Sequence, residues 1–113
     1  MAILEMETVV IALGASLSGA ATMEGRALAG IVMPAAWNAA DLTFQASHDG
    51  TTYNNLYDAA GTEVTVTAST SRFIQIATER YAGPLFLKVR SGTAGAAVVQ
   101  TAARNVILIF REI

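Results

Sequence analysis

Apolar and polar residues alternate most clearly in the segment from Leu42 to Asp58. The sequence LTFQAS (42–47) places apolar side chains on one face of an extended segment and polar side chains on the other, as in a half-buried strand. His48-Asp49-Gly50 follows, and Asp and Gly both tolerate the backbone conformations of a tight turn. An aromatic-rich segment from Tyr53 to Tyr57 then resumes the extended pattern. Together these features predict a β-hairpin.

Further strands are expected along the rest of the chain. The first should end near Leu13, and others are predicted over 27–33, 63–67, 72–77, 85–90 and 105–112. In 63–67 the valines alternate with threonines, so Val64 and Val66 are expected on one face and the threonines on the side that meets water. Residues 23–26 are predicted to connect the first strand to 27–33, because three glycines divide this part of the chain: Gly14, Gly19 and Gly25.

Two of these segments are less regular. Phe73 and Ile74 are adjacent, so 72–77 is expected to be covered on both faces. The alanine-rich segment 94–105 could form a helix, but Gly95 and the paired valines favour a loop followed by part of a strand.

About eight short strands separated by turns, without a helix of any length, predict an all-β fold. The expected architecture is a single-domain antiparallel β-sandwich, jelly-roll-like, over residues 1–113. A chain of this length buries roughly two thirds of its unfolded surface, which is enough for one stable core.

The charge content of the chain is low. Only 14% of residues are charged, against about 25% in ordinary globular domains. This predicts that part of the surface is covered by neighbouring copies in a homo-oligomer or by another protein. The net charge of -2 is spread without runs, so neither nucleic acid nor a membrane is an expected partner. Two glutamates precede the short apolar run Val9–Leu13, which argues against a signal peptide or a membrane span.

Catalytic and metal-binding chemistry has little support in the sequence. There is no cysteine, which excludes thiol nucleophiles and zinc-thiolate sites, and the single histidine, His48, is expected to be an exposed turn residue. Four carboxylates flank the hairpin, but their spacing does not match a helix-loop-helix calcium loop: Asp41, Asp49, Asp58 and Glu63. A structural calcium ion, as in a carbohydrate-binding sandwich, is the one remaining metal hypothesis. No enzyme activity, metal or cofactor is therefore predicted.

Four residues are candidates for an interface or a ligand-facing surface: Trp37, Tyr53, Tyr57 and Arg90. Aromatic faces can stack on sugar rings, which would suit a glycan-binding surface. Trp37 precedes a predicted strand, and this position favours an anchor in the core or at its rim.

The run IVMPAAWNAADLTFQASHDGTTYNNLYDAAGTEVTV, followed by LFLKVRSGT and VILIFRE, resembles a group of small tailed-bacteriophage virion-associated proteins. The group's pattern is P-x-x-W-x-A-A-x-L-T-F-Q-x-S-x-D-G-x-x-[FY]-x-x-L-Y-D-x-x-G-x-E-V, followed by K-x-R-S-G-T. It is matched from Pro34 to Val64 and again from Lys88 to Thr93. The resemblance implies a location in the virion and contact with other virion proteins, such as the major capsid protein or neighbouring particle components.

The same segments are similar, more weakly, to discoidin-like sandwiches of the galactose-binding type. The chain lacks the terminal cysteines of the secreted members and is shorter. Two functions are therefore predicted. The first is a structural virion protein, most simply a capsid decoration or other minor component. The alternative is a carbohydrate-binding adhesion module.

Overall fold

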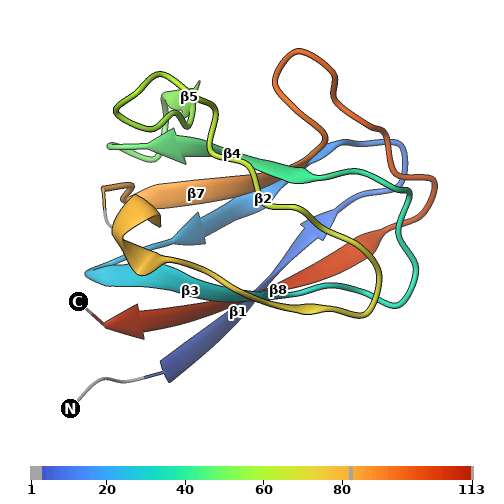
Figure 1. Ribbon diagram of the computed structural model, residues 1–113, viewed down its shortest axis with the longest axis horizontal. Coiled ribbons are helices and arrows are strands. Elements are labelled where there is room, and N and C mark those ends of the chain that lie inside the picture. Colours follow the sequence, from blue (N-terminus) through green and yellow to red (C-terminus); the bar gives the residue numbers. More distant parts are fainter. Residues whose placement is uncertain (1–3, 82, 113) are drawn as a thin grey trace.

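The computed structural model describes residues 4–81 and 83–112, and in these ranges the chain forms eight strands and one short 3-10 helix (Figure 1). Sheet A consists, in spatial order, of β1 (Leu4–Ile11), β8 (Arg104–Glu112), β3 (Arg26–Val32) and β6 (Phe73–Gln75). Sheet B consists of β2 (Leu17–Thr22), β7 (Phe86–Ser91), β4 (Leu42–Ser47) and β5 (Tyr53–Asn55). The helix η1 (Thr78–Tyr81) precedes β7.

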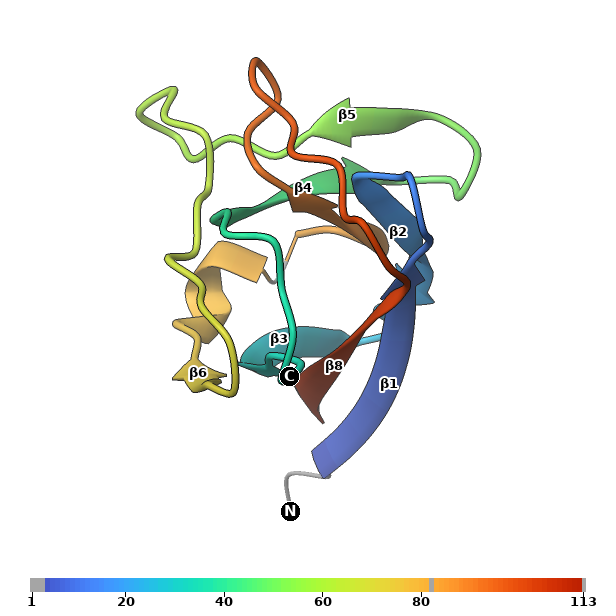
Figure 2. The same ribbon diagram turned by 90° about the vertical axis from the view of Figure 1, so that its right-hand side faces the viewer.

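The strand pairs are nested along the chain. β1 pairs with β8, β2 with β7, β3 with β6 and β4 with β5, and all of these pairs are antiparallel. Within the sheets, β3 also pairs with β8 and β4 with β7. The resulting orders, β1-β8-β3-β6 and β2-β7-β4-β5, are those of a long hairpin rolled into two facing sheets (Figure 2). The all-β, jelly-roll-like sandwich predicted from the sequence is confirmed.

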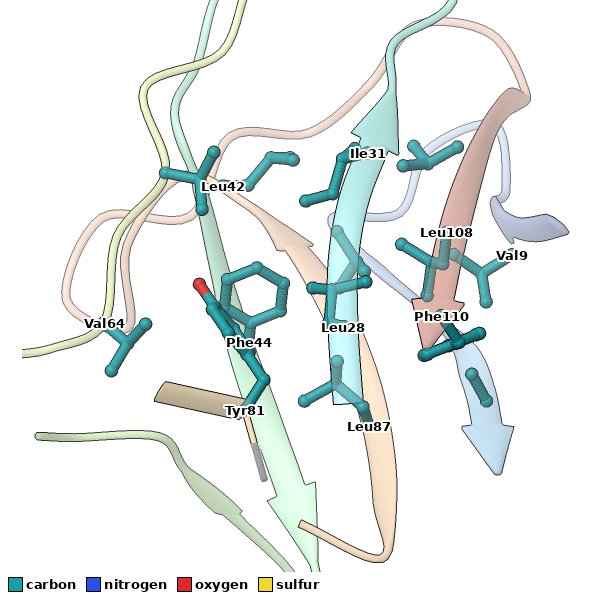
Figure 3. Close-up of a cluster of buried hydrophobic side chains, with 14 of the residues drawn as sticks. Val9, Leu28, Ile31, Leu42, Phe44, Val64, Tyr81, Leu87, Leu108 and Phe110 are labelled. Atoms are coloured by element: carbon teal, nitrogen blue, oxygen red, sulfur yellow. The ribbon is translucent and has the colours of Figure 1, made fainter. Parts of the chain in front are cut away.

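The core lies between the two sheets and is built from alternate strand positions (Figure 3). Phe44 from sheet B meets Tyr81 of η1 edge to face, with ring centroids 5.2 Å apart and an interplanar angle of 77°. Trp37 packs against this core from the loop before β4, as expected of a rim anchor. The fully buried side chains around them come from both sheets: Ile11, Ala21, Leu28, Ile31, Leu42, Leu87, Val89, Val106, Leu108 and Phe110.

Strand β2 was not predicted from the sequence, in which only residues 23–26 were expected to connect the first strand to 27–33. Its sequence, LSGAAT, has little apolar alternation, and only Ala21 is buried among its apolar side chains. Ser18 is also buried, and its hydroxyl accepts a hydrogen bond from the Val89 N–H at 2.9 Å, beside the register shift between Leu17 and Ala20. Pairing with β7, rather than local preference, therefore makes this segment a strand.

Residues 63–67 do not form a strand. They make isolated pairings, Glu63 with Tyr57 and Val66 with Leu42. The predicted alternation is nevertheless correct, because Val64 and Val66 are buried whereas Thr65 and Thr67 are exposed.

The prediction for 72–77 was also wrong in part. Only Phe73–Gln75 is a strand, and Phe73 is 69% exposed, so its outer face is open rather than covered. Residues 94–103 form a loop and β8 begins at Arg104. This confirms the prediction of a loop followed by part of a strand, rather than a helix.

Candidate protein interface

The face of sheet A that points away from the core is mainly apolar. Because Leu108 and Phe110 point into the core, Ile107 and Ile109 point outward, and their cross-strand partners lie on the same side. We define the sheet A outer face by seven residues from its four strands: Met6, Thr8, Val10, Val32, Phe73, Ile107 and Ile109. Three of these are large apolar side chains with high exposure, at 71% for Met6, 69% for Phe73 and 45% for Val10.

Phe73 lies close against the sheet because β3 has a glycine beneath it. A Cβ atom on Gly30 would lie 3.1 Å from Cε1 of Phe73 and 3.4 Å from Cβ of Ile109. The missing side chain therefore leaves room beside Gly30 for both Phe73 and Ile109, and Ile109 is only 7% exposed although it points outward. The strand register places Phe73 beside Val32, and Val32 beside Ile107, so apolar residues of neighbouring strands adjoin on this face.

A hollow of about 600 Å³ lies beside Phe73 at the β6 side of this face. Its lining combines apolar and polar side chains: Ala29, Phe73, Gln75, Ile76, Ala77, Thr78, Ile109 and Arg111. Arg111 lies near the end of β8, so the charge is at the border of the sheet A outer face and not at its centre. A charge-poor centre with polar groups at the rim is the usual anatomy of a protein interface.

Strand β1 forms one edge of sheet A and lies in the lower right part of the molecule in Figure 2. On its inner side, Glu5 and Glu7 approach the Arg26 guanidinium with N–O distances of 3.1 and 3.6 Å. The same guanidinium lies over the Phe110 ring, 4.3 Å from the centroid. These contacts hold both carboxylates toward their own sandwich and close this end of the core.

Arg90 lies in the middle of sheet B, on its outer face, and is only 6% exposed. Its guanidinium contacts Glu63 Oε2 at 3.2 Å, Thr43 Oγ1 at 3.3 Å and the side-chain oxygen of Asn55. Glu63 also accepts a hydrogen bond from the Ala94 N–H at 3.1 Å. Arg90 therefore ties two long loops to the sheet, and its donors are directed at protein groups.

The three candidate aromatic residues lie in different places. Trp37 is half-buried in the loop before β4, and its Nε1–H donates to the Ala40 carbonyl at 3.0 Å. Tyr53 pairs with Ser47 at the far end of β4, and Lys88 Nζ lies 4.2 Å from its ring centroid.

Tyr57 is the most exposed of the three, at 52%. It borders a hollow whose described lining contains neither Trp37 nor Tyr53: Leu56, Tyr57, Asp58, Ala59, Val64, Gly83 and Pro84. The three rings therefore do not form one stacking platform around this hollow.

A buried polar cluster around Gln100, formed with Asn38, Ser91 and Arg104, was not predicted from the sequence. Gln100 is fully buried, and its amide group donates to Ser91 Oγ at 2.7 Å and to the Asn38 carbonyl at 3.0 Å. Its side-chain oxygen accepts from the Asn38 N–H and from Arg104 Nε, at 2.8 and 3.0 Å. The only signal in the sequence was a glutamine in a run of small apolar residues, which does not reveal its partners.

The hairpin turn is built as the sequence predicts. His48 is exposed, and Asp49 Oδ1 accepts hydrogen bonds from the N–H groups of Thr51 and Thr52, both at 2.8 Å. These bonds lower the pKa of Asp49 from 3.8 to about 2, and the bond from Thr52 has the largest effect. The carboxylate thus has a structural role in the turn.

Within residues 4–81 and 83–112, His, Asp and Glu side chains nowhere gather in threes as a metal site requires. The helical segment described for the chain is too short to cross a membrane. In comparisons with known proteins, no protein-family model, no curated protein and no solved structure matches the chain.

Proposed function

We propose that this chain is a non-enzymatic structural component of a bacteriophage particle, a capsid decoration or other minor virion protein that acts through protein-protein contacts. Its partners are the major capsid protein or neighbouring particle components, together with further copies of itself. Such a protein works by burying surface at repeated contacts.

The observation that carries this proposal is the sheet A outer face. Met6, Val10 and Phe73 expose large apolar side chains on one side of the molecule, and the partly exposed Val32 and Ile107 lie on the strands between them. An exposed apolar face with its charge at the border favours a partner protein over water.

The distribution of polar groups supports the same proposal. Among the described residues, every buried side-chain nitrogen and oxygen has a hydrogen-bond partner within the chain. The most elaborate clusters, around Arg90 and Gln100, join loops to the sheets. These side chains are used to hold the fold together, which is what a structural protein requires.

The resemblance of residues 34–64 and 88–93 to small phage virion-associated proteins is the reason for proposing a bacteriophage particle as the location of this protein. Several of the matching residues have fold-building roles, among them Phe44, Asp49 and Arg90. The resemblance therefore supports a shared sandwich, and the apolar face supports the use of that sandwich in an assembly.

Two matched substitutions test the proposal in purified particles. Phe73→Lys places a charge on the sheet A outer face, and Tyr57→Lys places one at an exposed aromatic position elsewhere. We expect mass spectrometry of gradient-purified particles to detect the wild-type chain and the Tyr57→Lys variant, and to find the Phe73→Lys variant reduced at least tenfold. Thermal unfolding of both variants provides the control for folding. Particles that lack the wild-type chain after stringent washing would contradict the proposal.

The carbohydrate-binding alternative predicts the opposite pattern. If Tyr53 and Tyr57 bind sugars, Tyr53→Ala and Tyr57→Lys should abolish binding to a glycan array and Phe73→Lys should leave it unchanged. A folded protein that binds no glycan on the array favours the structural function.

A further inference from the structure

We propose that two copies of this chain pair through β1, antiparallel and about a two-fold axis at Thr8, so that their A sheets join into one continuous sheet. The inference deepens the proposed function by naming a second copy as one partner. β1 is eight residues long and is the terminal strand of sheet A, so one row of its backbone N–H and C=O groups has no partner strand in the described part of the chain. A long edge strand of this kind is a template for pairing with another strand.

The side chains of β1 complement each other about Thr8. In this register Met6 faces Val10 of the second copy, and Val10 faces its Met6. These two residues carry the large exposed apolar side chains on the outer side of β1. Thr8 is also exposed and faces Thr8 of the second copy, and threonine pairs are favourable across antiparallel strands. Pairing therefore covers both apolar side chains at once.

The charges of β1 argue for the same register. About Thr8, Glu7 faces Val9 of the second copy and Glu5 faces its Ile11. An axis at Glu7 would place Glu7 opposite Glu7 of the second copy, and an axis at Met6 would place Glu5 opposite its Glu7. Both registers are unfavourable, because like charges directly opposite each other are destabilising. An axis at Val9 avoids this repulsion but leaves Met6 opposite Ala12, the small residue that follows β1.

Arg26 makes the edge compatible with pairing. Charged side chains on the inner side of an edge strand normally discourage strand addition. Here the Arg26 guanidinium holds Glu5 and Glu7 at 3.1 and 3.6 Å, within the same copy. The paired sheets would also join two sheet A outer faces side by side, doubling the apolar surface that is presented to other particle proteins.

Cysteine cross-linking tests the register directly, because the chain has no cysteine. In the proposed pair, the Cβ atoms of two Thr8→Cys residues lie about 4.5–5.5 Å apart, close to disulfide range. Two Val10→Cys residues are four residues apart along the strands, about 14 Å, and cannot be bridged. Both positions are exposed in the single chain, so each variant serves as the folding control of the other.

Under mild oxidation of concentrated protein, we expect Thr8→Cys to form a covalent dimer at least tenfold faster than Val10→Cys. A mixture of Met6→Cys and Val10→Cys chains should form the heterodimer, which keeps the test decisive if Thr8→Cys fails to fold. Equal rates for all variants, or a wild-type chain that sediments as a monomer at several hundred micromolar, would overturn the inference. Absence of the chain from particles would instead contradict the proposed function, but it would not contradict the pairing of two copies through β1.

Discussion

Arg90 shows how one side chain can hold distant segments together. It lies on β7, yet its partners come from β4, from β5 and from the loop that carries Glu63. The Arg90 side chain is 7% exposed and that of Glu63 17%, so both charges depend on each other more than a surface ion pair would.

We expect Arg90→Ala to lower the free energy of unfolding by about 3 kcal/mol, because the Glu63 carboxylate, whose side chain is only 17% exposed, would lose its partner. Urea unfolding followed by circular dichroism measures this change. Arg90→Ala combined with Glu63→Ala should cost less than the sum of the two single changes. Strict additivity would show that the pair is not coupled.

Asp49 gives the hairpin turn a pH dependence with a defined sign. Because its pKa is lowered to about 2 in the folded chain, the ionised carboxylate stabilises the turn above pH 4, and this contribution is lost as the pH falls from about 4 to about 2. Asp49→Asn should therefore be less stable than the wild type at pH 6, with the difference shrinking toward pH 2. Urea titrations at several pH values measure it. A difference that stays constant with pH would contradict the assigned hydrogen bonds.

At the scale of elements, the loop from Gly92 to Ala103 depends on one backbone position. Gly92 has a φ of 89°, and a Cβ atom there would lie 2.5 Å from the Ala96 carbonyl oxygen and 2.7 Å from the Val98 nitrogen. The loop folds back on itself at this point, and its return leads to Gln100 in the buried polar cluster.

Gly92→Ala should lower the free energy of unfolding by at least about 2 kcal/mol, because the new side chain meets backbone atoms in a conformation that alanine rarely adopts. Gly95→Ala is the matched control, since nothing lies within 4 Å of a Cβ atom there. Its effect should stay within about 0.5 kcal/mol. Equal losses for the two variants in urea unfolding would contradict this account of the loop.

At the scale of the whole molecule, the nested strand pairs bring the two ends of the described chain together. Leu4 lies opposite Arg111, so the first and last strands are neighbours although nearly the whole sequence separates them. Closing this pair is expensive in conformational entropy, and folds dominated by such pairings fold slowly, in milliseconds to seconds.

A circular permutant tests this expectation. Joining the ends with a short flexible linker and opening the chain between Ala60 and Gly61, in an exposed turn, should preserve the far-UV circular dichroism spectrum. Refolding in stopped-flow experiments should become faster, because shortening the β1–β8 loop about tenfold saves roughly 2 kcal/mol of closure entropy. A folded permutant that refolds more slowly would show that β1–β8 pairing is not part of the folding barrier.

The sequence by itself determined the fold class, the hairpin turn and the inward side of alternating segments such as 42–47, because each of these depends on local alternation or on turn residues. Val64 and Val66 are buried as predicted even where no strand forms. Only the tertiary structure decided that LSGAAT is a strand, that Gln100 is fully buried and that Phe73 is exposed. Those outcomes depend on which segment comes to lie alongside another, and contacts between residues far apart in the chain leave no periodic signal in it. For the same reason, an apolar residue in the sequence could be assigned to a strand but not to the core or to the open face of a sheet.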